Sequence, residues 1–153
     1  MTTPRIKRIL AAIDFSELTG AVIAYARYLA QVFGAELKLL HVVHIPPLAE
    51  ATTWLTPLIS ASVEQDIRTQ VYQAVEAKLK EISEECGEAC KGVEALIREG
   101  VPFEQIIACA RELEIDLIVL GTHGRTGLTH TIIGSVAERV VRRAPCNVCL
   151  LYT

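Results

Sequence analysis

The sequence lacks any apolar run as long as the roughly 18 residues that a membrane-spanning helix needs. A short apolar run after the charged N-terminal residues is interrupted at Asp14, and it is too short for the apolar region of a signal peptide. We therefore expect a cytoplasmic protein with no membrane contact. Because the cytoplasm is reducing, its five cysteines are expected as thiols rather than disulfides.

Basic runs are missing too, and Lys and Arg (15) are outnumbered by Asp and Glu (18), which gives a net charge of −3. This balance gives little reason to expect a nucleic-acid partner. Internal repeats and low-complexity tracts are also absent. The chain is 51% apolar and 22% charged, so it can build an ordinary hydrophobic core. Its 153 residues predict a single domain, 1–153.

Short apolar runs alternate with amphipathic segments along the chain. The runs expected as strands are residues 9–13, 37–43, 93–97, 116–120 and 147–151. Strands that alternate with helices indicate a parallel sheet covered by helices on both faces. Ligands of such folds bind beyond the carboxyl ends of the strands. The loops after Ile13, Val43 and Leu120 are therefore expected to lie near one another.

Each helix is expected from apolar residues spaced at three or four. Ser16 is the expected N-cap of the first helix and Gly34 its end. The buried faces are expected to be Leu18, Val22, Tyr25, Leu29 and Val32; Ile67, Val71, Val75, Leu79 and Ile82; Pro102, Phe103, Ile106, Ile107, Ala110 and Leu113; and Val136, Ala137, Val140 and Val141. Between the second strand and the second helix, residues 44–60 form a Pro-rich connection. It is interpreted as a variable surface loop, with a lid or dimer contact through Trp54 as the alternative.

The most informative segment is the glycine loop, residues 121–135, which follows a predicted strand and precedes a predicted helix. Gly121 and Gly124 permit torsions and close approaches that a Cβ would forbid. Gly134 and Ser135 stand at a helix start, where free N–H groups and the helix dipole favour an anion. Neither G-x-x-x-x-G-K-[ST] nor G-x-G-x-x-G is present.

The spacing Gly121-x2-Gly124-x9-Gly134-Ser135 resembles the ATP-binding signature of the universal stress protein family. The resemblance extends to residues 9–16, 39–42, 100–102, 116–121 and 145–151. It implies an open five-stranded parallel sheet of order 3-2-1-4-5, which is Rossmann-like and similar to the adenine nucleotide α-hydrolase fold. It also implies ATP with Mg²⁺ as the cofactor and a homodimer formed through the C-terminal strand.

The resemblance also assigns roles by position. Asp14 matches an aspartate near the adenine and ribose, and Ala12 and Val42 would line the base. The remaining matched positions are Gly121 and Gly124 around the ribose and phosphates, and Gly134, Ser135 and Val136 at the phosphate-binding helix start. Leu120, directly before Gly121, is expected in the same site. Beside Gly124, Arg125 is the expected phosphate ligand because it stays charged and can bond bidentately. Ala12 replaces a proline that some members carry, and Gly127 is an extra glycine in the loop.

These features favour a nucleotide-dependent regulatory or stress-response module, with no residue assigned as catalytic. One alternative is a slow ATPase or autophosphorylating enzyme, in which Ser135, Thr122 and Thr126 supply hydroxyls near the phosphates. Another is a dimeric interaction module without nucleotide. His123 is interpreted as a brace of the loop or a phosphate contact, and His41 and His44 as structural histidines.

The cysteines are not expected to hold a metal. Cys146 and Cys149 are three apart on a predicted strand, so their side chains would point to opposite faces. Cys86 and Cys90 border a glycine-containing loop, where they are expected to be exposed and oxidisable.

Overall fold

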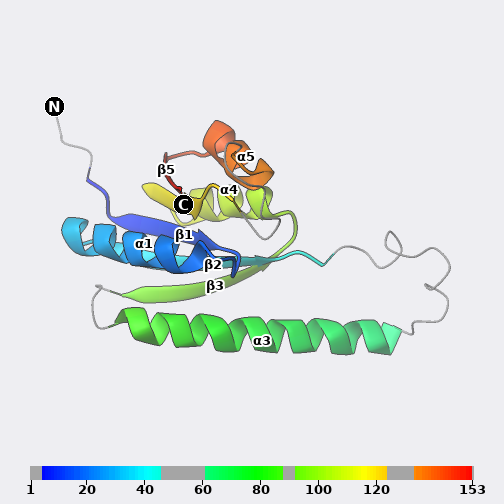
Figure 1. Ribbon diagram of the computed structural model, residues 1–153. Coiled ribbons are helices and arrows are strands. Elements are labelled where there is room, and N and C mark those ends of the chain that lie inside the picture. Colours follow the sequence, from blue (N-terminus) through cyan, green and yellow to red (C-terminus); the bar gives the residue numbers. More distant parts are fainter. Residues whose placement is uncertain (1–4, 46–60, 88–91, 124–132, 153) are drawn as a thin grey trace.

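The computed structural model describes residues 5–45, 61–87, 92–123 and 133–152 (Figure 1). Strands and helices alternate along these residues as β1 (Arg8–Ile13), α1 (Thr19–Phe33), β2 (Glu36–Val43), α3 (Ala61–Gly87), β3 (Val93–Glu99), α4 (Pro102–Glu112), β4 (Leu117–Gly121), α5 (Ser135–Arg143) and β5 (Asn147–Leu151). No described helix is both long and apolar enough to cross a membrane. Trp54 and most of the Pro-rich connection lie outside the described residues.

The five strands form one sheet of order β3-β2-β1-β4-β5, and every neighbouring pair is parallel. The predicted sheet and its strand order are therefore confirmed. In the centre of the sheet, Ala11 of β1 lies between Leu39 of β2 and Val119 of β4, and all three are buried. The strand order reverses at β1, because the chain adds β2 and β3 on one side and β4 and β5 on the other.

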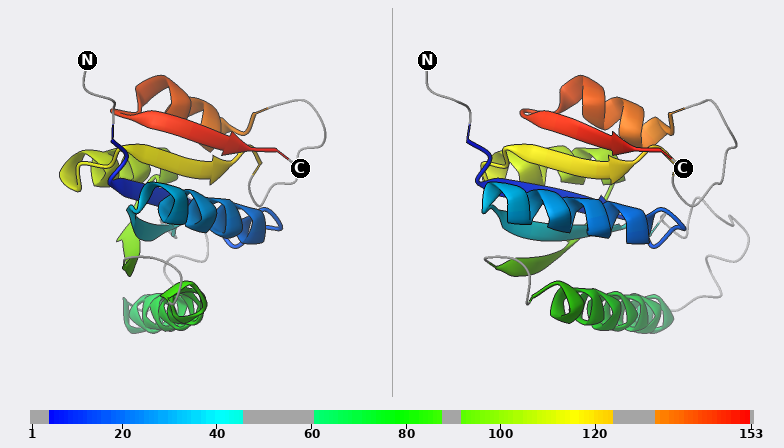
Figure 2. Two further views of the ribbon diagram at one scale, coloured as in Figure 1. Left: turned by 90° about the vertical axis from the view of Figure 1, so that its left-hand side faces the viewer. Right: turned by 60° about the vertical axis from the view of Figure 1, so that its left-hand side comes forward.

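Helices cover both faces of the sheet, and each face has its own hydrophobic core (Figure 2). On one face α1 and α3 bury a cluster that includes Val22, Ala26 and Leu79. On the other face α4 and α5 bury a cluster that includes Ile106 and Val140. Pro102 begins α4 as expected, since a proline loses no hydrogen bond in the first helical turn.

The start of α1 differs from the prediction. Ser16 is not its N-cap, because the helix begins at Thr19 and no side chain caps it. Ser16 lies in a turn instead. Its N–H donates to Oδ1 of Asp14 at 3.0 Å, and its carbonyl oxygen accepts from the N–H of Thr19 at 3.0 Å. The Asp14 carboxylate therefore organises this turn. Gly34 ends the helix as predicted, and its backbone is in the left-handed conformation.

The buried face of α1 is also rotated from the predicted one. Val22, Ala26 and Ala30 face the sheet, whereas Tyr25 and Val32 are 41% and 58% exposed. The small alanines bring the helix close to the strands. The predicted face rests on large apolar residues and therefore omits these alanines. Similar errors occur at single positions of α3 and α5, because Ile67 and Val141 are exposed.

The cysteines meet one expectation and contradict another. Cys146 and Cys149 pack into the cores on opposite faces of the sheet, as the strand period predicts. Cys86 was expected to be exposed, but its side chain is buried on the inner side of α3. Cys90 lies outside the described residues. Burial raises the pKa of the Cys146 and Cys149 thiols, which makes both poor nucleophiles.

Candidate functional site

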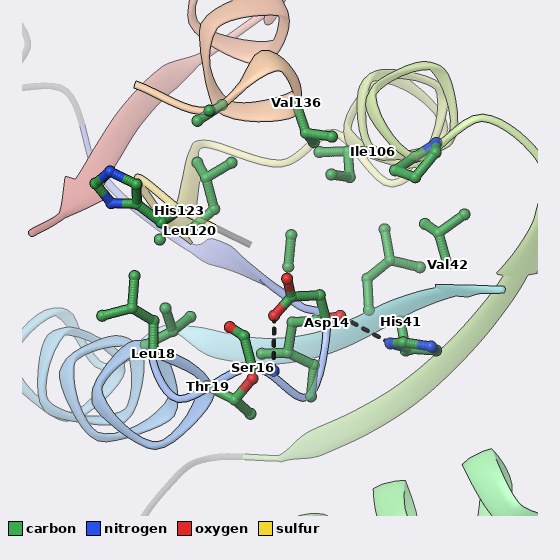
Figure 3. A pocket seen from close by; sticks show the side chains of 18 of the residues that line it. Asp14, Ser16, Leu18, Thr19, His41, Val42, Ile106, Leu120, His123 and Val136 are labelled. Carbon is green, nitrogen blue, oxygen red and sulfur yellow. Dashed lines mark hydrogen bonds between the residues drawn. The ribbon is translucent and has the colours of Figure 1, made fainter. Parts of the chain in front are cut away.

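A cavity of about 400 Å³ opens at the carboxyl ends of β1, β2 and β4 (Figure 3). This is the edge at which the strand order reverses, where ligands of open α/β sheets bind. Its lining includes Ala12, Asp14, Val42, Leu120, Gly121, Gly134, Ser135 and Val136. These are all of the residues predicted for the site except Gly124 and Arg125, which lie outside the described residues. The predicted residues come from four separate segments of the chain, and α4 adds a fifth segment to the lining.

The middle of the cavity is apolar. Leu40 and Val42 of β2, Ile106 of α4, Leu120 of β4 and Val136 of α5 contribute aliphatic side chains to its wall. In Figure 3, Val42, Ile106 and Val136 surround the space above β2. Such a wall suits a flat, largely apolar group, with orientation fixed by a few polar groups at the margin.

Asp14 stands where β1 ends. One carboxylate oxygen, Oδ1, accepts the Ser16 N–H, and the side chain lines the cavity. The next residue, Phe15, has a φ of 60°. This left-handed conformation is unfavourable for a bulky residue, so the surrounding turn must hold it in place. The Asp14–Ser16 hydrogen bond is one such restraint.

Two histidines line the cavity, His41 within β2 and His44 directly after it. His41 is buried; its Nδ1 lies 2.9 Å from the carbonyl oxygen of Ile13, and its ring stacks on Phe15 with centroids 4.3 Å apart. A carbonyl oxygen only accepts, so Nδ1 carries the proton. The expected structural role of His41 is confirmed. His44 lies at the cavity margin, with Nδ1 3.1 Å from the carbonyl oxygen of Gly100.

At the other end of the cavity α5 begins. Gly134 is its N-cap, and the N–H of Gly134 donates to the carbonyl oxygen of Thr122 at 2.7 Å. A Cβ on Gly134 would lie 2.9 Å from the same oxygen, closer than real Cβ contacts. Gly134 is thus required for close approach, and its own N–H is used within the protein. The N–H groups of the first turn, from Ser135 on, are the donors without intrahelical partners that remain for an anion.

Gly121 is also a close-packing glycine. A Cβ there would lie 2.9 Å from Cδ1 of Leu18. Its backbone is not left-handed, since the positive-φ glycines among the described residues are Gly34 and Gly100. The prediction of a special torsion at Gly121 is therefore wrong, and the prediction of a close approach is confirmed.

Thr122 joins the end of β4 to its neighbours. It is 1% exposed, and both its N–H and its hydroxyl donate to the carbonyl oxygen of Leu151, at 2.9 and 3.1 Å. Because its one proton is used there, the hydroxyl accepts from Nδ1 of His123 at 2.9 Å. Thr122 therefore offers no free hydroxyl for phosphorylation, and His123 braces the loop. Of the other two candidate hydroxyls, Ser135 lines the cavity and Thr126 lies outside the described residues.

Unpartnered polar atoms gather at this cavity. In the described part of the chain, the buried side-chain atoms without a hydrogen-bond partner are Oγ of Ser16, Oγ1 of Thr19 and Nε2 of His123. All three residues line the cavity. Buried polar groups are nearly always paired, so each such exception calls for an explanation. A polar ligand bound in this cavity would give all three atoms a hydrogen-bond partner. Sequence reasoning treated Ser16 only as a cap and did not single out Thr19.

The model of the universal stress protein family matches residues 5–151. This chain belongs to the universal stress protein family. Two related members are a universal stress protein A homolog from Coxiella burnetii and the universal stress protein MJ0531 from Methanocaldococcus jannaschii. The first is 34% identical over 95% of this chain and 96% of its own length. The second is 33% identical over 95% of this chain and 81% of its own length.

Solved structures of the family share the fold. MJ0577 of Methanocaldococcus jannaschii aligns with a TM-score of 0.80 at 25% identity, covering 97% of this chain and 96% of the other. A universal stress protein in complex with cAMP aligns with a TM-score of 0.70 at 22% identity over 98% and 99%. An Arabidopsis thaliana universal stress protein with AMP bound aligns with a TM-score of 0.64 at 20% identity over 95% and 90%.

Proposed function

We propose that this universal stress protein binds an adenine nucleotide, ATP with Mg²⁺, and acts as a nucleotide-dependent regulatory module. The observation that carries the proposal is the composition of the cavity. One part is an aliphatic wall, and the far end is the N-terminus of α5. A nucleotide has a matching arrangement, with a flat, largely apolar base at one end and charged phosphates at the other.

The base would lie against Ala12, Val42 and Ile106, beside Asp14. Asp14 has one carboxylate oxygen held by Ser16. Its other oxygen is an acceptor suited to the exocyclic amine of adenine or to a ribose hydroxyl. Leu120 and Gly121, which also line the cavity, would lie against the sugar. AMP and cAMP in the solved relatives support an adenine nucleotide as the ligand class.

The phosphates would be bound at the start of α5. The backbone N–H groups of Ser135 and Val136 and the Ser135 hydroxyl are donors there, and the helix dipole adds about 0.3–1 kcal/mol. Gly124 and Arg125 are proposed to complete the cradle. Mg²⁺ usually keeps several waters and binds through one or two carboxylates and the phosphates. Asp14 is the one carboxylate among the described residues that line the cavity. The phosphates and water would therefore supply most of the ligands of Mg²⁺.

Regulation would act through a homodimer formed along β5. This strand is at the edge of the described sheet and has the uncharged sequence NVCLL. Protected edge strands usually carry charge, proline or a covering element. An uncharged edge that is apolar on both faces is suited to pairing with an identical strand.

Mass spectrometry of nucleotide released from the purified protein tests the proposal, followed by calorimetric titration with Mg·ATP. We expect ATP or ADP to co-purify, or ATP to bind with a measurable heat. A protein without nucleotide that gives no heat at millimolar ATP would contradict the proposal. Titration with Mg·GTP tests the assignment of the base end, since equal affinity for both nucleotides would contradict adenine selectivity.

A further inference from the structure

The side chain of His41 contacts the residues on both sides of Asp14. Its Nδ1–H donates to the carbonyl oxygen of Ile13 at 2.9 Å, and its ring stacks on Phe15 with centroids 4.3 Å apart and an angle of 26° between the ring planes. Figure 3 shows this hydrogen bond as the dashed line that ends at His41. One imidazole therefore holds the chain before and after the residue that we propose as a nucleotide ligand.

The register of the sheet places His41 at this point. Ile13 and His41 form the last residue pair between β1 and β2. Leu39 and Val43 of β2 point into the core under α1 and α3, so His41, which lies between them at the strand period of two, points to the same face. Phe15 packs against that core as well, and His41 is only 6% exposed. The ring is therefore enclosed, and the fold fixes its two contacts.

Each contact of His41 restrains one end of the Asp14 backbone. The peptide plane between Ile13 and Asp14 contains the Ile13 carbonyl oxygen, so the hydrogen bond from His41 fixes the orientation of that plane. Phe15 follows Asp14 with a φ of 60°, which is unfavourable for a bulky residue. Stacking on His41 holds the Phe15 side chain in place and supports this conformation. The direction in which the Asp14 side chain leaves the backbone is thus set by His41.

The Asp14 carboxylate has little remaining freedom once its backbone is fixed. Oδ1 accepts the Ser16 N–H at 3.0 Å, and the side chain lines the cavity. A carboxylate on a fixed backbone that is also held at one oxygen has its second oxygen in a defined position. An acceptor that is already in position binds its ligand more tightly, because less conformational freedom is lost on binding.

We infer that His41 is a positioning residue for the nucleotide site and acts through Asp14. The inference rests on the proposed function, in which the second oxygen of Asp14 accepts a hydrogen bond from the nucleotide. His41 needs no contact with the nucleotide for this role. Its hydrogen bond to Ile13 and its stacking on Phe15 direct the Asp14 carboxylate toward the ligand before the ligand binds.

A double-mutant cycle between His41 and Asp14 tests the inference, with Mg·ATP affinity measured by calorimetric titration of the purified protein. His41→Leu removes both contacts, and we expect the affinity to fall about tenfold. In the Asp14→Asn background the second oxygen is already lost as an acceptor, so the same change should lower the affinity by less than about twofold. A purely structural effect of His41→Leu would lower the affinity equally in both backgrounds.

Two further variants each keep one contact and guard against a loss of folding. His41→Asn places an amide N–H donor near the position of Nδ1 and loses the ring, whereas His41→Phe keeps a ring and loses the donor. Each should recover part of the affinity that His41→Leu loses. Val75→Ala is the control for stability alone, since Val75 is buried in the same core and does not line the cavity. It should lower the melting temperature and leave Mg·ATP affinity unchanged.

The Ser16 amide proton gives a readout that needs no nucleotide. It is bonded to Oδ1 of Asp14, so its hydrogen exchange, measured by nuclear magnetic resonance, reports how firmly the carboxylate is held. We expect His41→Leu to speed this exchange about fivefold or more, and Val75→Ala to leave it unchanged.

The outcomes separate the inference from the proposed function. If the wild type binds Mg·ATP and a folded His41→Leu variant keeps the same affinity, the positioning role is overturned and the proposed function stands. Equal losses in the wild-type and Asp14→Asn backgrounds would also overturn the positioning role. A wild type that binds no nucleotide would contradict the proposed function instead. Ser16 exchange that His41→Leu leaves unchanged would then overturn the positioning of Asp14 by His41 as well.

Discussion

The N–H of Gly134 donates to the carbonyl oxygen of Thr122 at 2.7 Å, and this one hydrogen bond ties the start of α5 to the end of β4. Thr122 and Gly134 lie in the two described parts of the glycine loop, residues 121–123 and 133–135. Their contact sets the position of the first turn of α5 relative to the sheet. The proposed phosphate site therefore depends on a backbone contact that only glycine at position 134 allows.

Gly134→Ala is expected to weaken nucleotide binding. The added Cβ would meet the Thr122 oxygen at 2.9 Å, a backbone atom that cannot move aside as a side-chain tip can. The first turn of α5 would shift, and the loss of aligned N–H donors is expected to lower Mg·ATP affinity about tenfold or more. Calorimetric titration measures the effect.

Gly92→Ala is the control for this change, because a Cβ on Gly92 meets nothing within 4 Å. It should bind Mg·ATP like the wild type. If Gly134→Ala keeps wild-type affinity while remaining folded, the start of α5 is not the phosphate site.

Asp14→Asn is expected to separate the structural and ligand-binding parts of this side chain. The amide oxygen of asparagine can still accept the Ser16 N–H, so the turn and the melting temperature should be retained. The second oxygen becomes an NH₂ group, which cannot accept from a ligand. We expect Mg·ATP affinity to fall about tenfold with little change in melting temperature. An unchanged affinity would mean that Asp14 serves the turn alone.

Thr122→Val is expected to destabilise the fold by about 1–3 kcal/mol, because the variant loses the hydroxyl donation to Leu151 and leaves Nδ1 of His123 without its acceptor. Urea unfolding monitored by circular dichroism measures this. Thr69→Val is the comparison, since the Thr69 hydroxyl donates to Gln65 on the exposed side of α3. If both changes cost the same, the Thr122 hydroxyl has no special role.

The contact between α3 and β3 is expected to weaken at acid pH. Hydrogen bonds from Tyr72 and Arg68 lower the pKa of Glu99, with the Tyr72 bond contributing most. A carboxyl with a lowered folded pKa stabilises the fold above its unfolded pKa and loses that contribution as the pH falls through the folded value. Stability should therefore decrease below the ordinary pKa of glutamate near 4.5.

Tyr72→Phe removes the main cause of this shift. The variant should lose less stability than the wild type between neutral pH and the acid range, measured by urea unfolding at each pH. Equal pH dependence of the two proteins would show that the Tyr72–Glu99 hydrogen bond does not control the acid response.

Much of the sheet was predictable because it follows from local apolar runs. β5 spans the predicted residues, and the other strands differ from prediction by a few terminal residues. The helix faces were harder to predict. Ala26 and Ala30 carry the close contact of α1 with the sheet, and alanine gives a weak signal in an apolar pattern. Tyr25 and Val32 are large and apolar, so the pattern predicts them on the buried face, although both are exposed.

The candidate site was predicted from residues whose backbone matters. Gly121 and Gly134 stand out in a sequence, and the cavity contains both. What the sequence did not reveal is why they are glycines, since the Leu18 and Thr122 contacts are made across the fold. Thr19 and the Thr122–Leu151 connection were missed for the same reason. Hydroxyl residues are common, and only tertiary packing shows which of them lack or share a partner.

The cavity borders both hydrophobic cores of the molecule. Ile13 and Val22 in its lining belong to the core under α1 and α3, whereas Ile106 and Ala137 belong to the core under α4 and α5. The sheet otherwise separates these two cores. A ligand in the cavity would contact both cores at once and link them at one end of the sheet. The two halves of the molecule would then unfold as one cooperative unit, and nucleotide would sharpen the thermal transition as well as raise its midpoint.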